Sequence, residues 1–192
     1  MKMPTPEEAL KRLKDGNQRY VEQKLTHPNQ TAERRAELSS GQYPYAVILG
    51  CSDSRVPPEV IFDQGMGDLF VIRVAGNIAD DVVLGSIEYA AEHLHTPLIV
   101  VMGHSKCGAV SAVASGTELD GHLPSLGKII QPAVDKAKGK PGDLVTNAAK
   151  TNAEMTADML RTSEPVLSNL VKAGKVDVVT AYYDLDTGIC EF

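Results

Sequence analysis

Four short apolar runs, rich in β-branched residues and separated by stretches of helical character, most constrain what this chain can fold into. They lie at residues 45–49, 69–74, 97–102 and 176–183. Continuous apolar runs of this length are typical of parallel strands that are covered on both faces. Their alternation with helical segments predicts an α/β fold with an open, mainly parallel four-stranded sheet and helices on both faces. A turn at 184–188 should return residues 189–192 as a C-terminal antiparallel edge strand.

Helical segments are expected between these strands and also ahead of them. They lie at about 58–63, 81–93, 108–115 and 124–173, the last interrupted near 139–142 and 163–165. At the N-terminus, Thr5 caps a helix that should run to about residue 23, with Glu8 completing a capping box. A second short helix is expected at 31–38. Because the amphipathic first helix precedes any strand that could serve as its core partner, we expect it to lie across another subunit.

Length and composition indicate one globular domain, 1–192, with an N-terminal helical arm (1–40) and an α/β core (41–192). The net charge of -6 argues against general nucleic-acid binding. No apolar run approaches the roughly 18 residues of a membrane span, so no membrane contact is expected. The first ten residues lack the apolar stretch of a signal peptide, which predicts a cytoplasmic protein, or a periplasmic one if a leader has been removed.

Two cysteines and a histidine follow the first and third apolar runs. Cys51 lies in CSDSRV, and His104 and Cys107 lie in GHSKC. Because ligand sites in open α/β sheets lie beyond the carboxyl ends of strands, we expect these three side chains to meet there. A catalytic zinc takes three protein ligands and keeps a fourth position for water or substrate. Asp53 could fill that position or leave it open.

The spacing within each motif supports a metal site. His104 and Cys107 are three residues apart, which lets both reach one ion from a loop that enters a helix. The amino end of a helix starting at Gly108 would favour a thiolate at Cys107. Neither H-x-x-C nor C-x-D-x-R is specific alone, but their joint occurrence at two strand ends is much stronger evidence. The alternative is that both cysteines are buried apolar-like residues and His104 is an ordinary loop histidine.

Taken together, CSDSRV and GHSKCGAV, with FVIRVAGN and IEYAAEHL between them, resemble a β-class carbonic anhydrase over residues 16 to 184. The resemblance implies one Zn²⁺ held by Cys51, His104 and Cys107, and a catalytic dyad of Asp53 and Arg55. The implied reaction is reversible hydration of carbon dioxide to bicarbonate and a proton, by zinc-bound hydroxide that the dyad orients. The family's members pair through an interface that contributes pocket residues, which implies a homodimer or a dimer of dimers.

The same resemblance favours the open-site, type I-like subtype of that family. The positions that match its substrate pocket are Gln42, Phe70, Ala75 and Tyr89, and the Gly108 amide is a further substrate donor. The closable, bicarbonate-regulated subtype carries a tryptophan where this chain has Ile48. We therefore expect Asp53 to pair with Arg55 and to leave the zinc open at neutral pH.

Two alternative functions use the same scaffold. One is a hydrolase acting on carbonyl sulfide or carbon disulfide, and the other is a non-catalytic zinc-binding bicarbonate sensor. Other classes fit poorly. A cysteine phosphatase needs its arginine six positions after the nucleophile, the glycines near Met66 lack the third glycine of a dinucleotide loop, and no C-x-x-C redox motif occurs.

Overall fold

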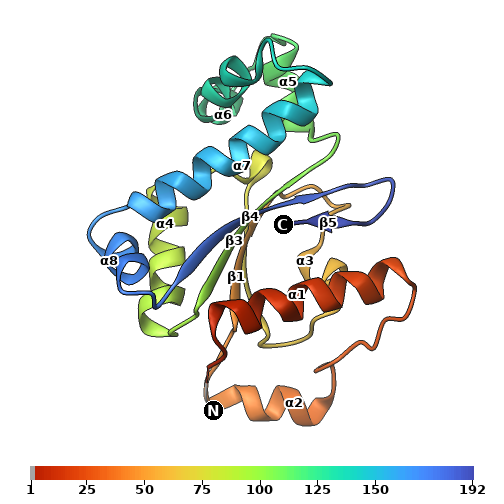
Figure 1. The fold of residues 1–192 in the computed structure, drawn as a ribbon, viewed down its shortest axis with the longest axis vertical. Coiled ribbons are helices and arrows are strands. Elements are labelled where there is room, and N and C mark those ends of the chain that lie inside the picture. Colours follow the sequence, from red (N-terminus) through yellow and green to blue (C-terminus); the bar gives the residue numbers. More distant parts are fainter. Residues whose placement is uncertain (1–2) are drawn as a thin grey trace.

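The computed structural model describes residues 3–192 and is built around one five-stranded sheet (Figure 1). The strands are β1 (Ala46–Gly50), β2 (Leu69–Arg73), β3 (Leu98–His104), β4 (Asp177–Tyr183) and β5 (Cys190–Glu191). Their order is β2-β1-β3-β4-β5; the first four are parallel, and β5 is antiparallel to β4. The predicted mainly parallel sheet with an antiparallel C-terminal edge strand is confirmed.

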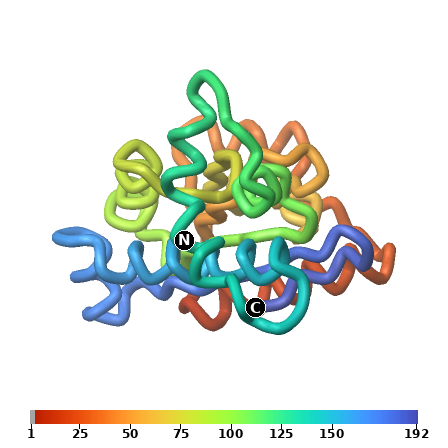
Figure 2. The backbone as a smooth tube through the Cα atoms, turned by 90° about the horizontal axis from the view of Figure 1, so that it is seen from above, coloured from red at the N-terminus to blue at the C-terminus, as the bar shows by residue number. Residues whose placement is uncertain are grey.

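Helices cover both faces of the sheet, as expected. They are α1 (Pro6–Val21), α2 (Ala32–Glu37), α3 (Pro58–Ile61), α4 (Asp81–Glu88), α5 (Gly108–Ala114), α6 (Leu123–Ala137), α7 (Leu144–Thr162) and α8 (Val166–Lys172). Shorter helical turns are η1 (Leu38–Ser40), η2 (Ala75–Asn77) and η3 (Tyr89–His93). The breaks predicted near 139–142 and 163–165 separate α6 from α7 and α7 from α8. The connection between α5 and α6 projects from the body of the molecule (Figure 2).

The central strands β1 and β3 are buried along their whole length. Successive side chains of a strand point to opposite faces, so each strand contributes to two apolar clusters. Ile48 and Val100 belong to the cluster that α1 and α3 cover, whereas Leu49 and Val101 belong to the cluster under α4, α7 and α8 (Figure 1). The sheet is thus enclosed from both sides, so side chains that follow the two central strands can meet only beyond the ends of these strands.

The first helix packs on its own chain. The predicted capping box is present, with Thr5 and Glu8 each bonding the other's backbone amide. Ala9 and Leu13 are fully buried in the cluster that they share with β1 and β3. The side chain of Asn17 donates to the Gly188 carbonyl at 2.9 Å, tying α1 to the C-terminal hairpin. The expectation that this helix has no core partner in its own chain was therefore wrong: strands that follow it in the sequence supply that partner.

A buried carboxylate fixes the loop that follows α1. The carboxylate of Asp63, which is 2% exposed, accepts hydrogen bonds from Arg19 at 2.6 Å, from the Thr26 amide and hydroxyl, and from the His27 amide. Burial alone would raise the pKa of Asp63, but these donors outweigh it and lower the pKa to about 2. The ionised carboxylate therefore stabilises the folded state.

We expect Asp63→Asn to lower the free energy of unfolding at pH 7 by about 2–3 kcal/mol, since charged hydrogen bonds are lost and Arg19 is left unpaired. A carboxyl group titrates near 3.9 when unfolded, so this stabilisation is present above about pH 4 and is lost as the pH falls towards 2. The pH dependence of this stabilisation can be measured by urea unfolding at several values between about pH 3 and about pH 7. Asp135→Asn, at an exposed ion pair with Lys138, is the control and should have much less effect on the free energy of unfolding. Equal losses in the two variants would contradict the assignment.

The carboxyl ends of β1, β2 and β3 meet at one edge of the sheet. Gly50 pairs with Arg73 on one side and with Met102 on the other. The segments after these strands therefore lie side by side, and they include the predicted ligands.

Among residues 3–192, no helix is both long and apolar enough to cross a membrane.

Candidate metal centre

The structure brings the three predicted ligands together. Cys51 directly follows β1, His104 is the last residue of β3, and Cys107 is the residue that precedes α5. One ligand atom from each lies within 4.8 Å of the others. All three side chains are buried, with exposed fractions of 5%, 1% and 1%. Such a cluster of two sulfurs and one imidazole is a donor set that suits zinc.

The imidazole of His104 is oriented for a ligand. Its Nδ1 lies 2.9 Å from the carbonyl oxygen of Ser105, which fixes the ring and makes Nδ1 the protonated nitrogen. Its Nε2 is buried and has no hydrogen-bond partner among the described residues. A buried nitrogen without a partner is costly, and a metal ion would satisfy it. The residues present therefore fit zinc.

The two thiols influence each other's ionisation. A hydrogen bond from Cys107 lowers the pKa of Cys51 to about 4, and the same contact raises the pKa of Cys107. The Gly76 amide adds a hydrogen bond to the Cys51 sulfur at 3.3 Å, which also favours the thiolate. Because metal ligands of this kind must be deprotonated, a divalent ion at this position would replace the thiol proton and bind both sulfurs.

The turn between the two later ligands is held by the C-terminal hairpin. The Ser105 amide donates to the Tyr183 carbonyl at 2.9 Å, and the Leu185 amide donates to the Ser105 hydroxyl at 2.8 Å. Lys106 takes a left-handed conformation, with φ of 55°, between these two bonds and Cys107. The turn thus brings His104 and Cys107 to the same side.

Asp53 pairs with Arg55 beside this cluster. Arg55 donates Nε to Oδ1 at 2.9 Å and Nη2 to Oδ2 at 2.7 Å, a bidentate arrangement. These hydrogen bonds hold the pKa of Asp53 well below its usual range. Arg55 also donates to the Lys106 carbonyl at 3.3 Å, which ties the pair to the turn between His104 and Cys107. The carboxylate of Asp53 is therefore ionised and held in a defined orientation.

Sequence reasoning missed Arg73. This last residue of β2 donates Nε to the Cys51 carbonyl at 2.8 Å and Nη2 to the Asp53 carbonyl. It clamps the backbone that carries the first ligand and the carboxylate. A signal was present, because Arg73 is the one charged residue in the run FVIRV and stands where that strand ends.

The predicted pocket residues fall into two groups. Ala75 and Gly108 adjoin the cluster: Ala75 precedes Gly76, which bonds Cys51, and Gly108 directly follows Cys107. A Cβ atom added at Gly108 would meet nothing within 4 Å, so the space beside it is open.

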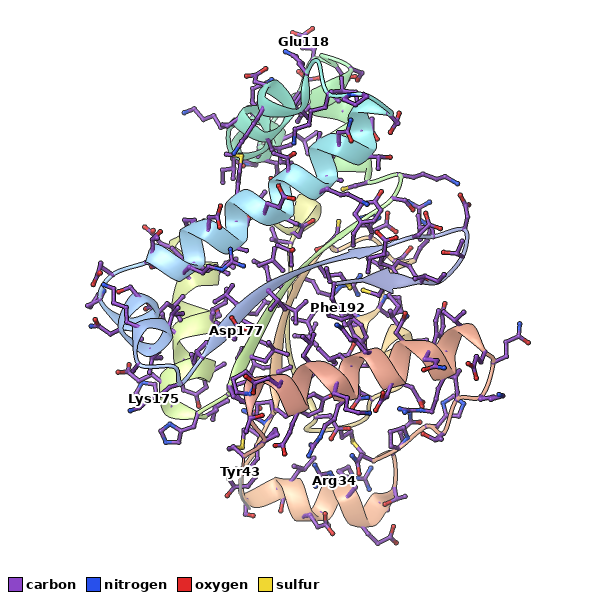
Figure 3. The ribbon with its side chains drawn as sticks, in the orientation of Figure 1. Arg34, Tyr43, Glu118, Lys175, Asp177 and Phe192 are labelled. Atoms are coloured by element: carbon purple, nitrogen blue, oxygen red, sulfur yellow. The ribbon has the colours of Figure 1, made fainter. Side chains whose placement is uncertain are left out.

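Gln42, Phe70 and Tyr89 lie away from the cluster of their own chain. Phe70 pairs with Val47, four residues before Cys51, which places it about 13 Å towards the amino end of the sheet. The Tyr89 ring lies 6.3 Å from the Phe70 ring, and Gln42 precedes β1. Figure 3 labels Lys175, which precedes β4 and so marks the amino end of the sheet, in the lower half of the view. Tyr43, the neighbour of Gln42, is labelled in the same half. Within one chain these three residues do not line the metal centre.

The structure defines an α/β protein with a buried Cys-His-Cys cluster that could hold a metal ion, at the carboxyl ends of its strands. The comparisons identify its family. Residues 46–190 match the family model described as carbonic anhydrase. The chain is 41% identical over 187 residues to carbonic anhydrase 2 of Mycobacterium tuberculosis, covering 95% of this chain and 90% of the relative. It is 55% identical over 120 residues to a carbonic anhydrase of Mycolicibacterium smegmatis, covering 62% and 58%.

Solved structures agree with this match. The β-carbonic anhydrase CafA of Aspergillus fumigatus superposes with a TM-score of 0.71 at 29% identity, over 96% of this chain and 88% of that one. One of two tetrameric β-carbonic anhydrases from Sordaria macrospora superposes with a TM-score of 0.75 at 27% identity, over 82% and 84%. The chain therefore belongs to the β-carbonic anhydrase family and is a carbonate dehydratase.

Proposed function

We propose that this protein hydrates carbon dioxide reversibly to bicarbonate and a proton, with a zinc ion held by Cys51, His104 and Cys107. The observation that carries the proposal is the buried cluster in which Nε2 of His104 has no partner among the described residues. Zinc bound there would lower the pKa of a coordinated water to about 7 and so supply hydroxide at neutral pH.

The proposed role of Asp53 is to orient the attacking oxygen. Both of its oxygens accept hydrogen bonds from Arg55, so the carboxylate cannot rotate freely. Because its pKa is lowered, it is ionised at neutral pH and serves as an acceptor only. Accepting the hydrogen of the nucleophile would aim an oxygen lone pair at the substrate carbon, which is a positioning effect. Arg73 supports this arrangement from the backbone side.

Residues beside the cluster would form the substrate pocket. Ala75 supplies a small apolar wall for carbon dioxide, which has no charge and no donor. The first amides of a helix have no partner within the helix, so the Gly108 amide in the first turn of α5 can donate to a substrate oxygen.

A second copy of the chain would complete the pocket. Gln42, Phe70 and Tyr89 can serve a metal centre only by reaching one in another subunit, because they lie near the amino end of their own sheet. Tyr89 is 48% exposed, and β2 is an edge strand, so both are available for contact. We therefore propose a homodimer or a dimer of dimers; the Sordaria macrospora neighbour is described as tetrameric.

Zinc analysis together with stopped-flow carbon dioxide hydration across pH tests the proposal. We expect about one zinc per chain, as a single Cys-His-Cys site requires, and turnover that a strong chelator removes and added zinc restores. A metal-loaded protein without turnover would support a sensor. Slow hydration combined with fast hydrogen sulfide release from carbonyl sulfide would support the other hydrolase. The comparisons support neither of these alternatives.

A further inference from the structure

We propose that Asn152 is a positioning residue for the metal centre, although it belongs to α7 and touches none of the three ligands directly. It would act through Gly76, whose amide bonds the sulfur of Cys51. This inference rests on the proposed zinc site and adds a residue that neither metal-binding motif contains.

The first link is the contact between Gly76 and Cys51. The Gly76 amide donates to the Cys51 sulfur at 3.3 Å, a buried hydrogen bond. Gly76 has a φ of 75°, a left-handed conformation that favours glycine. A Cβ atom added there would lie 2.7 Å from Cδ1 of Ile130, so a side chain at this position would also have to displace the end of Ile130. The amide reaches the sulfur only because the backbone takes this particular path.

The second link is the side chain of Asn152. Its Nδ2 donates to the Gly76 carbonyl at 2.8 Å, and the residue is only 3% exposed. A buried amide with a short hydrogen bond to a backbone carbonyl restrains that carbonyl strongly, because leaving either group unpaired costs free energy. Gly76 is thus held at its carbonyl by Asn152 while its N–H is directed at Cys51.

The third link is the close packing of α7 against β3. A Cβ atom added at Gly103 would lie 3.2 Å from the Ala149 carbonyl oxygen and 3.6 Å from Cβ of Ala153. The helix therefore lies in close contact with β3 one residue before His104, and Asn152 lies between Ala149 and Ala153 in sequence. Because α7 is held against β3 in this way, the packing of the helix also sets the distance from Asn152 to Gly76.

Loss of this restraint should be visible at the metal. A hydrogen bond to a thiolate withdraws electron density from sulfur and fixes its direction, and outer partners of metal ligands typically contribute 10–100-fold in metal affinity or activity. If Asn152 no longer holds Gly76, the amide moves away from the sulfur. The sulfur electrons then lie higher in energy, and the direction of the thiolate is less restricted. We expect the loss of this fixed direction to weaken metal binding.

The test is Asn152→Leu, which keeps the approximate volume but removes the donor. We expect the zinc dissociation constant, measured by chelator competition, to rise about 10-fold or more. In the cobalt-substituted protein we expect the sulfur-to-metal charge-transfer band to move to longer wavelength, because the sulfur electrons are no longer stabilised by the amide. Thr96→Val is the matched control: it removes the buried bond from the Thr96 hydroxyl to the Pro44 carbonyl, at the amino end of the sheet. It should leave both readouts unchanged.

A folded Asn152→Leu protein with unchanged zinc affinity and cobalt spectrum overturns the inference. Should that variant not fold, the native sequence loaded with cadmium-113 decides. We expect scalar coupling between the metal and the Gly76 amide proton, and slow exchange of the Asn152 side-chain amide; absence of either overturns the inference. A native protein that binds no metal at all would instead refute the proposed function.

Discussion

Replacing Cys107 with serine is expected to abolish metal binding and carbon dioxide hydration together. Serine keeps the size of the side chain, but its hydroxyl does not ionise as readily as a thiol, so the site loses an anionic ligand. Only Cys51 and His104 would remain of the buried cluster. We expect the affinity for zinc to fall by more than the 10–100-fold that is typical of outer partners. Zinc content after dialysis and stopped-flow hydration measure the two effects.

Cys190→Ser is the matched control for this prediction. Cys190 is also a buried free cysteine, but it belongs to β5, and its amide bonds the side chain of Asn17 on the α1 side of the hairpin. Metal content and turnover should both survive this change. A Cys107→Ser protein that kept its zinc and its activity would remove Cys107 from the ligand set.

Asp53→Asn is expected to keep the metal but to lose most of the activity. The three ligands are unchanged, whereas the new amide presents a donor where the carboxylate presented an acceptor. Arg55 also loses a charged, bidentate partner, so the side chain at position 53 is no longer held. Misplacement of a positioning group by about 1 Å can cost roughly 10²-fold, and we expect at least a loss of that size in kcat.

Asp186→Asn provides the comparison for Asp53→Asn. Asp186 also pairs with a cation near the centre, Lys106, but both side chains are exposed, so the pair contributes little. Its turnover should match that of the native protein, with zinc content equal in all three proteins. Full activity in Asp53→Asn would remove the pair with Arg55 from the mechanism.

Most of the fold could be predicted from local patterns in the sequence. The apolar runs predicted β1 to β4 because a strand buried on both faces needs continuous apolar residues, and the capping box at Thr5 predicted where α1 begins. The meeting of Cys51, His104 and Cys107 was also predictable, since residues that follow parallel strands lie at one sheet edge. The antiparallel β5 followed from the turn after β4.

Other features depend on contacts between distant segments, and only the tertiary structure decided them. The amphipathic pattern of α1 shows that one face is buried but not against what, so its place on β1 and β3 in its own chain was missed. The backbone clamp by Arg73 and the bond from Asn152 to Gly76 join strands and helices that are remote in sequence. The position of Phe70 away from the Cys-His-Cys cluster of its own chain follows from the register of β2 on β1, and Tyr89 packs against Phe70.

The sequence by itself determined the sheet and which cysteines and histidine would meet, because strand patterning and the place of a residue after a strand are properties of local sequence. The pairing of Asp53 with Arg55 was expected from the resemblance of the motif to the family, and the structure contains it. The tertiary structure alone decided what holds Cys51 in place and which pocket residues lie beside it. Those depend on distances between elements, which packing of the whole chain sets and no local pattern encodes.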